Sequence, residues 1–250
     1  MKIRDHAKSF MTDRRITAKK YHDLHGRQRI QYIWDYYKLP LLAACIILYI
    51  IGYIIYGKVT HKDVALYIAS VNITMSDSLS AELTDGFLSV SDIDSSHNTV
   101  SLYSNLYLTD DTDDEMFQYS YASSMKILGS IDGELLDIVI MNQEAFDAFS
   151  QNGYLCDLKA LLTNTDLELY EQLESALTTN IIIQDNNSSE LNLDESASYT
   201  AEIEEGLYGL DLSGSSLIQE AGFDGTLYLG VIENSPRKDI AIAYLHFLYS

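Results

Sequence analysis

Residues 39–56 have the sequence LPLLAACIILYIIGYIIY, in which none of the eighteen residues is charged. At 1.5 Å per residue, a helix of this length covers about 27 Å, close to the roughly 30 Å hydrocarbon core of a bilayer. The alternative is a buried helix of a soluble core, but a core helix usually keeps one polar face, and this stretch has none. The sequence therefore predicts a transmembrane helix over residues 39–57.

Charge is distributed very unequally on the two sides of this stretch. Residues 1–38 carry ten Lys and Arg against four Asp, a net charge of +6, whereas the part after Lys58 carries five basic and 33 acidic residues, a net charge of −28. Basic residues next to a membrane span stay on the cytoplasmic side. We therefore expect a single-pass protein of the cell membrane with a basic cytoplasmic tail (1–38), a transmembrane helix (39–57) and an acidic extracytoplasmic domain (58–250).

The basic tail is too short and too polar to bury a core of its own. Juxtamembrane Lys and Arg gain about 1 kcal/mol each near anionic lipid, so we expect the tail to lie along the anionic headgroups of the inner leaflet. Nucleic-acid binding is the alternative for a basic arm. Because four Asp are interspersed and no folded reader domain is attached, we expect the lipid bilayer, and no nucleic acid, as its partner.

Two processing signals compete with a permanent span. A cleavable signal peptide has a short basic region, whereas 38 residues precede the apolar stretch here. Residues 42–45, LAAC, match the pattern at which bacterial lipoproteins are cleaved and acylated. That pattern requires the apolar run to precede the Cys, and here most of the run follows it. We therefore expect Cys45 to be an ordinary residue of the helix.

Beyond the span, short apolar runs alternate with amphipathic stretches. The apolar runs predict strands at 64–71, 99–108, 135–141, 180–184, 207–212 and 226–232. Two capping boxes and other start signals predict helices near 77–90, from 112–115, from Asn142 to Asn152, from 165–168, near 216–219 and from Ser235 onward. Residues 185–205 are polar and are expected to form an exposed loop or weak hairpin. This alternation predicts an α/β domain with a mainly parallel sheet.

Residue spacing makes two of these predictions specific. Alternation within 99–108 places four apolar residues on the same side of the strand: Val100, Leu102, Leu106 and Leu108. In the helix that begins with Ser235 as N-cap and Pro236 at its first position, the inward residues are expected to be Ile240, Ala243, Tyr244 and Phe247.

Three stretches resemble a known family. Residues 137–162, DIVIMNQEAFDAFSQNGYLCDLKALL, are similar to the segment of extracellular solute-binding proteins in which a strand ends in DIV, a helix follows and G-x-L-x-D-L closes the unit. Residues 208–222, YGLDLSGSSLIQEAG, and 227–249, LYLGVIENSPRKDIAIAYLHFLY, resemble the return strand of this family and its strand-to-helix unit ending in A-x-x-(F/Y)-L-x-F-L. The resemblance implies a bacterial protein with the first-lobe fold of a type 2 periplasmic-binding-protein-like receptor.

The chain departs from this family between the first two of these stretches. A solute-binding protein of this type has two lobes that close on the ligand, and the second lobe falls in the interval that residues 163–207 occupy here. These 45 residues are too few for a second α/β lobe of ordinary domain size. The resemblance therefore implies a reduced, membrane-anchored form that lacks most of the second lobe.

No catalytic or cofactor motif is found in the sequence. It contains no G-x-S-x-G and no glycine-rich phosphate loop, and Gly206, Gly209 and Gly214 are expected in turns. The acids at 110–115 lack the Gly and Glu of a calcium loop. We therefore expect no enzyme activity, no cofactor and no metal site.

Reactive side chains are few outside the predicted span. His97 and His246 have no neighbouring ligand at zinc spacing. Cys156 is the only thiol after the span, so no intrachain disulfide can form there, and its apolar neighbours favour a buried structural Cys over a reactive one.

A ligand site is expected at the carboxyl ends of the strands, where ligands lie in open α/β sheets. Asn72, Ile73 and Thr74 follow the first predicted strand, and Asn142 and Gln143 follow the third. We predict ligand contacts from Asn72, Thr74, Asn142 and Gln143, which suit a neutral or cationic solute because no cation is among them. The structural alternative is that Asn142 only caps its helix and Thr74 only belongs to a turn.

These observations predict a non-catalytic binding or interaction module of the cell envelope with a protein partner. The alternative is a membrane-tethered solute-binding subunit of an ABC-type importer. That alternative would require residues 178–206 to supply a second wall to the cleft.

Overall fold

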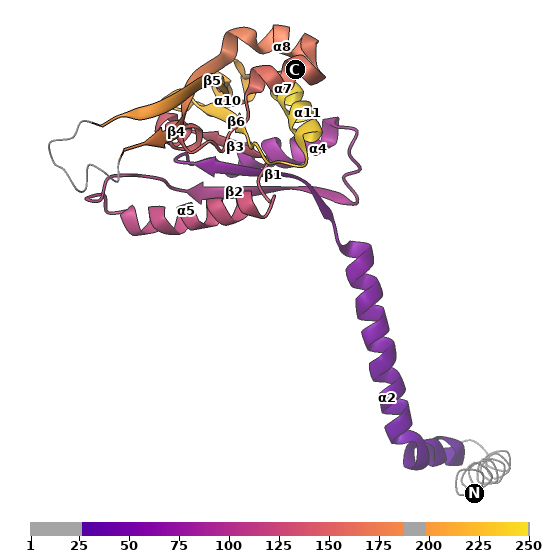
Figure 1. Cartoon of the computed structure of the whole chain (residues 1–250). Helices are drawn as coiled ribbons and strands as arrows, with labels where there is room; N and C mark the ends of the chain where they lie inside the picture. The colour runs from indigo at the N-terminus through magenta and orange to yellow at the C-terminus, as the bar shows by residue number, and fades with distance from the viewer. Residues whose placement is uncertain (1–26, 188–198, 250) are drawn as a thin grey trace, which may run out of the picture. The chain divides into compact units, whose positions relative to one another are not determined.

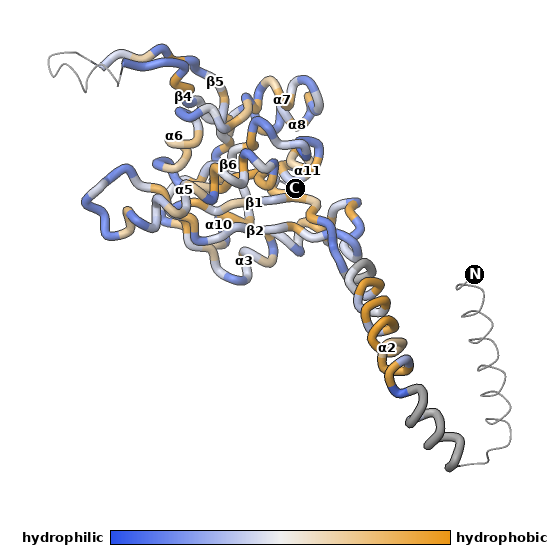
Figure 2. Tube along the Cα trace, turned by 60° about the horizontal axis from the view of Figure 1, so that its bottom comes forward, coloured by the Kyte–Doolittle hydropathy of each residue, from blue (hydrophilic) through white to orange (hydrophobic). Residues whose placement is uncertain are grey.

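The computed structural model describes residues 27–187 and 199–249. It divides into two compact units, one ending at His61 and the other beginning at Lys62. The first unit contains helix α2 (Arg27–Thr60) (Figure 1). Its apolar segment, Lys38–Gly57, is the one helical segment among the described residues that is long and apolar enough to cross a membrane, and Figure 2 shows its hydrophobic colouring.

None of the Lys38–Gly57 segment is buried. This exposure removes the alternative of a soluble-core helix, which would bury most of its surface. A membrane span and a signal sequence share the observed length and composition. Residues 1–26 of the predicted basic tail lie outside the described residues.

The second unit is built on a six-stranded sheet with the order β2-β1-β3-β6-β5-β4. Strand β1 pairs in parallel with β2 and β3. Strand β6 is antiparallel to both β3 and β5, and β4 is antiparallel to β5. The strands are β1 (Asp63–Val71), β2 (Asn98–Leu106), β3 (Ile138–Met141), β4 (Leu177–Asn186), β5 (Ala201–Asp211) and β6 (Tyr228–Val231).

Helices cover both faces of this sheet, which confirms the α/β class (Figure 1). One face packs against α5 (Phe117–Asp132) and α6 (Gln143–Gln151). The elements on the other face are α3 (Asp77–Ala81), the π-helical turn η1 (Glu82–Gly86), α4 (Phe87–Val90), α7 (Leu158–Thr165), α8 (Leu167–Leu173), the short 3₁₀ turns η2 (Glu174–Ala176) and η3 (Leu212–Gly214), α10 (Ser216–Ala221) and α11 (Lys238–Leu248).

Strand β3 shows why the central strands are continuously apolar. Ile138 and Ile140 pack into the core beneath α11, whereas Val139 and Met141 pack into the core beneath α5 and α6. All four side chains are fully buried. A strand covered on both faces has no solvent side, so it needs no polar alternation.

The predicted alternation along 99–108 is wrong in its second half. Val100 and Leu102 pack into the α11-side core, but Leu106 and Leu108 pack into the α5-side core. The β1–β2 register shifts near this point, and Asn105 has φ 59°. Such an irregularity adds a residue to one strand and reverses the sides of those that follow.

The first predicted capping box does not cap a helix. Asp111 Oδ1 accepts from Asp113 N at 2.9 Å and Asp114 Oδ1 accepts from Met116 N at 2.7 Å, so these acids form side-chain turns. Helix α5 begins only at Phe117 and has no side-chain cap. In the second box, the cap of α8 is Asp166 rather than Thr165.

Two further details differ from the sequence prediction. Helix α11 begins at Lys238, and Ala243 is exposed, although Tyr244 is buried as expected. Gly206 and Gly209 lie within strand β5 rather than in turns, beneath the rings of Tyr208 and Phe146.

Residues 163–207 do not form a second lobe in their described part. They contribute the end of α7, helix α8, the turn η2, strand β4 and much of β5, and both strands extend the same sheet. The predicted loop at 185–205 is partly strand, and its residues 188–198 lie outside the described part of the chain.

Candidate functional site

Asn72 fastens the carboxyl end of β1 to the chain that follows β2. It adopts a left-handed conformation with φ 57°, and its backbone N–H donates to Leu106 O at 2.9 Å. Its side-chain Nδ2 donates to Leu108 O at 2.8 Å, while its Oδ1 accepts from Leu108 N at 2.7 Å. The amide that we predicted to bind a ligand is therefore engaged in holding Leu108.

The other three predicted residues also lie at this edge of the sheet. Asn142 is the N-cap of α6 and accepts from Ala145 N at 3.0 Å, as in the structural alternative. Gln143 is exposed and donates to Asp147 Oδ1 at 2.8 Å. Thr74 is exposed in the segment between β1 and α3. The predicted edge therefore exists, but its amides are committed mainly to local structure.

Carboxylates surround this edge. Asn72 Nδ2 lies 3.5 Å from Glu144 Oε2, and Asp147 Oδ1 also accepts from Asn180 Nδ2 at 2.9 Å. The pKa of Tyr228, whose ring stacks on Phe146, is raised by burial and by the charges of Asp211 and Asp147. The local field therefore disfavours an anion and favours a neutral or cationic group.

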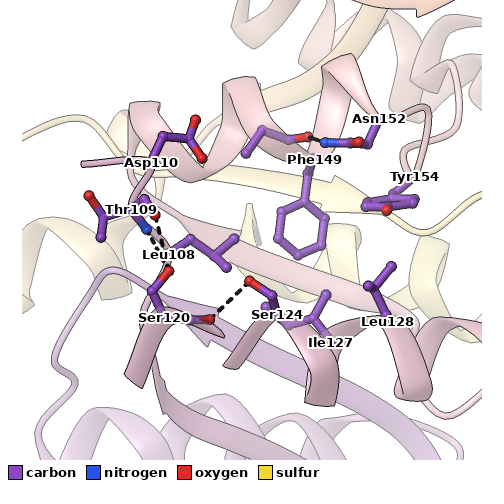
Figure 3. Close-up of a pocket in the computed structure, with 11 residues that line it drawn as sticks. Leu108, Thr109, Asp110, Ser120, Ser124, Ile127, Leu128, Phe149, Asn152 and Tyr154 are labelled. Atoms are coloured by element: carbon purple, nitrogen blue, oxygen red, sulfur yellow. Dashed lines mark hydrogen bonds between the residues drawn. The ribbon is translucent and has the colours of Figure 1, made fainter. Parts of the chain in front are cut away.

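A cavity of about 180 Å³ lies between α5 and α6, beside the residue that Asn72 holds (Figure 3). One wall is the chain after β2, and the others come from the two helices and the turn after α6. The lining residues are Leu108, Thr109, Asp110, Ser120, Ser124, Ile127, Leu128, Ala148, Phe149, Asn152 and Tyr154.

Most polar groups of the cavity are bonded to the protein's own backbone. Ser120 Oγ accepts from Thr109 N at 2.9 Å, and Ser124 Oγ donates to Ser120 O at 2.9 Å. Asn152 Nδ2 donates to Ala148 O at 2.7 Å. Figure 3 shows the Phe149 ring pointing between these groups.

The surface left for a ligand is therefore more apolar than polar, with one charged side chain. Asp110 is the only charged side chain among the lining residues. Asp110 is an exposed residue, so its negative charge attracts a cation at the mouth of the cavity only weakly. The cavity thus suits a small neutral or cationic solute.

Sequence reasoning did not identify the cavity. The predicted ligand residues lie at the ends of strands, whereas most of the cavity lining comes from α5 and the second half of α6. A weak signal exists: Ser120 and Ser124 lie one helical turn apart on α5, and their small side chains leave space where larger apolar residues would fill it.

Other reactive side chains lie apart from the cavity. His97 Nδ1 pairs with Asp94 Oδ2 and His246 Nε2 pairs with Asp166 Oδ2, each at 2.8 Å. Cys156 is buried, as expected, and its burial raises the pKa of the thiol to about 12. Among the described residues, no three His, Cys, Asp or Glu side chains are arranged to hold a metal ion.

No family model and no curated protein matches this chain. A solved structure to which it is similar is described as the "substrate binding domain of putative molybdenum ABC transporter from Clostridium difficile". The two share 13% sequence identity with a TM-score of 0.33, over 75% of this chain and 93% of that chain. Similarity at this level carries no conclusion about the ligand or the function of this chain.

Proposed function

We propose that this chain is a single-pass membrane protein whose acidic α/β domain acts outside the cytoplasm as a non-catalytic binding or interaction module of the cell envelope. The exposed apolar segment of α2 supports a membrane anchor, and the charge difference between +6 and −28 supports the orientation. In this orientation the tail faces anionic lipid headgroups and the domain faces a protein partner.

The observation that carries this proposal is the single sheet. Strands β4 and β5, which come from the interval where a second lobe would stand, extend the sheet that contains β1 and β3. Capture of a solute by closure needs two bodies that move against each other. A domain with one sheet cannot enclose a solute in this way, but its exposed surface can bind another protein.

A membrane-tethered solute-binding subunit of an ABC-type importer is the second candidate, and the α5–α6 cavity favours it. At about 180 Å³, the cavity is smaller than the roughly 300–1,000 Å³ of sites that hold drug-sized ligands. Its solute would be small, and neutral or cationic because of Asp110.

Chemical crosslinking in intact membranes, followed by mass spectrometry, tests the first candidate. We expect discrete crosslinks from residues of the second unit to one partner protein. A chain that is crosslinked to no protein at all, at full expression in its own membrane, would contradict the interaction module.

Thermal melting of the purified full-length chain in detergent separates the two candidates. Amino acids, sugars, oligopeptides and polyamines serve as probes, since a ligand of the folded state raises the melting temperature. A solute receptor predicts a shift that Ala148→Leu abolishes, because the larger side chain fills the cavity. The matched control is Ala122→Leu on the exposed side of α5. The interaction module predicts no shift with any of these solutes.

A further inference from the structure

A larger groove lies between α4 and α11, on the face of the sheet opposite α5 and α6. Its volume is about 560 Å³. The aromatic rings of Phe87 and Phe247 meet in it with centroids 5.6 Å apart, and Ile93 and Ile240 continue the apolar lining. Val90, at its margin, is 70% exposed.

Carboxylates mark the rim of this groove. Asp92 lines it from the chain after α4, and Asp239 lines it from α11; both residues are exposed. The one basic side chain in the lining is His246, which is already paired with Asp166 at 2.8 Å. The groove therefore combines an apolar floor with a negatively charged rim.

These two properties together indicate a partner. Contiguous exposed apolar surface with a polar rim marks interaction sites on soluble domains. A domain with a net charge of −28 repels acidic chains, including a second copy of itself, and attracts basic ones. Grooves between helices commonly receive the apolar face of an amphipathic helix.

We propose that the α4–α11 groove binds a segment of a protein partner in which large apolar side chains are flanked by Lys or Arg, as on one face of a basic amphipathic helix. This inference rests on the proposed function as an interaction module, and it names the chemistry of the partner. The apolar side chains pack on the groove floor over Phe247, Ile93 and Ile240, and the bases lie against Asp92 and Asp239.

The test uses the full-length protein in nanodiscs of zwitterionic lipid, which removes the electrostatic attraction of a basic peptide to the bilayer, and empty nanodiscs of the same lipid measure the binding to lipid that remains. The probe is a fluorescein-labelled amphipathic helix of Leu and Lys, and binding is measured by fluorescence anisotropy. We expect saturable binding that weakens as salt is raised. A peptide of the same pattern with Glu in place of Lys is expected not to bind.

Two variants block the groove in different ways. Ala243→Trp fills it from an exposed position of α11 and is expected to weaken binding about tenfold or more. Val90→Lys places a positive charge at its margin and is expected to weaken binding about fivefold. Unchanged circular dichroism and melting temperature show that each variant is folded.

Two double variants compare the removal of negative charge at the groove with its removal elsewhere on the surface. The double variant Asp92→Asn/Asp239→Asn is expected to weaken binding about fivefold. Asp113→Asn/Asp224→Asn removes the same charge from exposed positions that do not line the groove, and it is expected to leave the affinity within about twofold.

Three results would overturn the inference. They are absence of saturable binding, equal binding of the Glu peptide, and full affinity in folded Ala243→Trp and Val90→Lys variants. The two proposals fail separately. If the partner found by crosslinking in membranes is still crosslinked in Ala243→Trp, the groove is not its site but the interaction module stands; if no protein is crosslinked at all, the interaction module itself is contradicted.

Discussion

Asp137 and Arg237, which lie 100 positions apart in the sequence, form an ion pair in which Arg237 Nε donates to Asp137 Oδ2 at 2.8 Å. The carboxylate is fully buried. It also accepts from Tyr67 N at 2.8 Å and from Ser235 Oγ at 2.6 Å. One side chain thus joins β1, the start of β3 and the segment that leads into α11.

Arg237→Met should destabilise the domain strongly. Removing one partner leaves a buried carboxylate without its counter-charge, which typically costs about 3–5 kcal/mol. Urea denaturation of the full-length chain in detergent, followed by circular dichroism, measures the change. Lys238→Met is the matched control, because Lys238 pairs with Glu233 at 3.4 Å nearer the surface, and such pairs contribute about 1 kcal/mol or less. Equal effects of the two variants would contradict the structural role of the buried pair.

Gly209→Ala should also destabilise the domain. A methyl group added to Gly209 would lie 2.5 Å from Phe146 Cζ, so the ring must move within a packed core. Overpacking of this kind costs about 1–3 kcal/mol. Gly129→Ala on α5 meets no atom within 4 Å, and it is expected to stabilise the helix by about 0.5–1 kcal/mol. If the packing is as described, thermal melting will show a lower melting temperature for Gly209→Ala and a higher one for Gly129→Ala, each relative to the unmodified chain.

Asp166 should make the domain sensitive to acid. Its pKa is lowered by hydrogen bonding from the Leu169 backbone N–H and from His246. A carboxylate whose pKa is lowered on folding stabilises the protein above its unfolded value of about 3.9, and this contribution is lost as the pH falls through the folded value. Asp166→Asn keeps the cap but cannot titrate, so its melting temperature should fall less steeply between about pH 4 and pH 2. Asp224→Asn, at an exposed position, serves as the control, and a parallel decline in all three proteins would contradict the prediction.

Cys45→Ala should leave membrane association intact. If the apolar segment Lys38–Gly57 spans the bilayer, its insertion exceeds what one acyl chain on Cys45 contributes. Fractionation of membranes after alkaline washing measures the retained protein. Release of Cys45→Ala, but not of Ala44→Ser, into the soluble fraction would show that acylation is the anchor.

Protease added to intact protoplasts should digest the part after Lys58 and spare residues 1–38. The physical reason is the charge division across the span, +6 against −28. Antibodies against tags at each end report which part survives, and detergent lysis before digestion is the control. Protection of the acidic part would reverse the proposed orientation.

The sequence predicted the central strands well because burial on both faces dictates their composition. Residues 64–71 and 135–141 contain β1 and β3 almost completely. The cap at Asn142 was also identified, since a cap depends on neighbouring backbone groups only. Local patterns therefore sufficed for these two strands and for this cap.

Prediction from sequence failed where distant groups decide the geometry. The positive φ of Asn105 reverses the sides of β2, and nothing in the apolar pattern marks it. One local prediction also failed: Asp111 and Asp114 form side-chain turns with backbone N–H groups two residues later instead of capping a helix. The α5–α6 cavity depends on how two helices meet, so its lining residues could not be found from strand ends.

Strand β6 lies between β3 and β5 but follows all other strands of the sheet in the sequence. During synthesis, the edges of β3 and β5 that face β6 therefore stay unpaired until residues 228–231 emerge. Non-local pairing of this kind slows folding and leaves strand edges exposed to other chains. The domain consequently completes its sheet late in translation, and a chain truncated before Tyr228 would keep the edges of β3 and β5 exposed, which makes it a target for quality-control proteases.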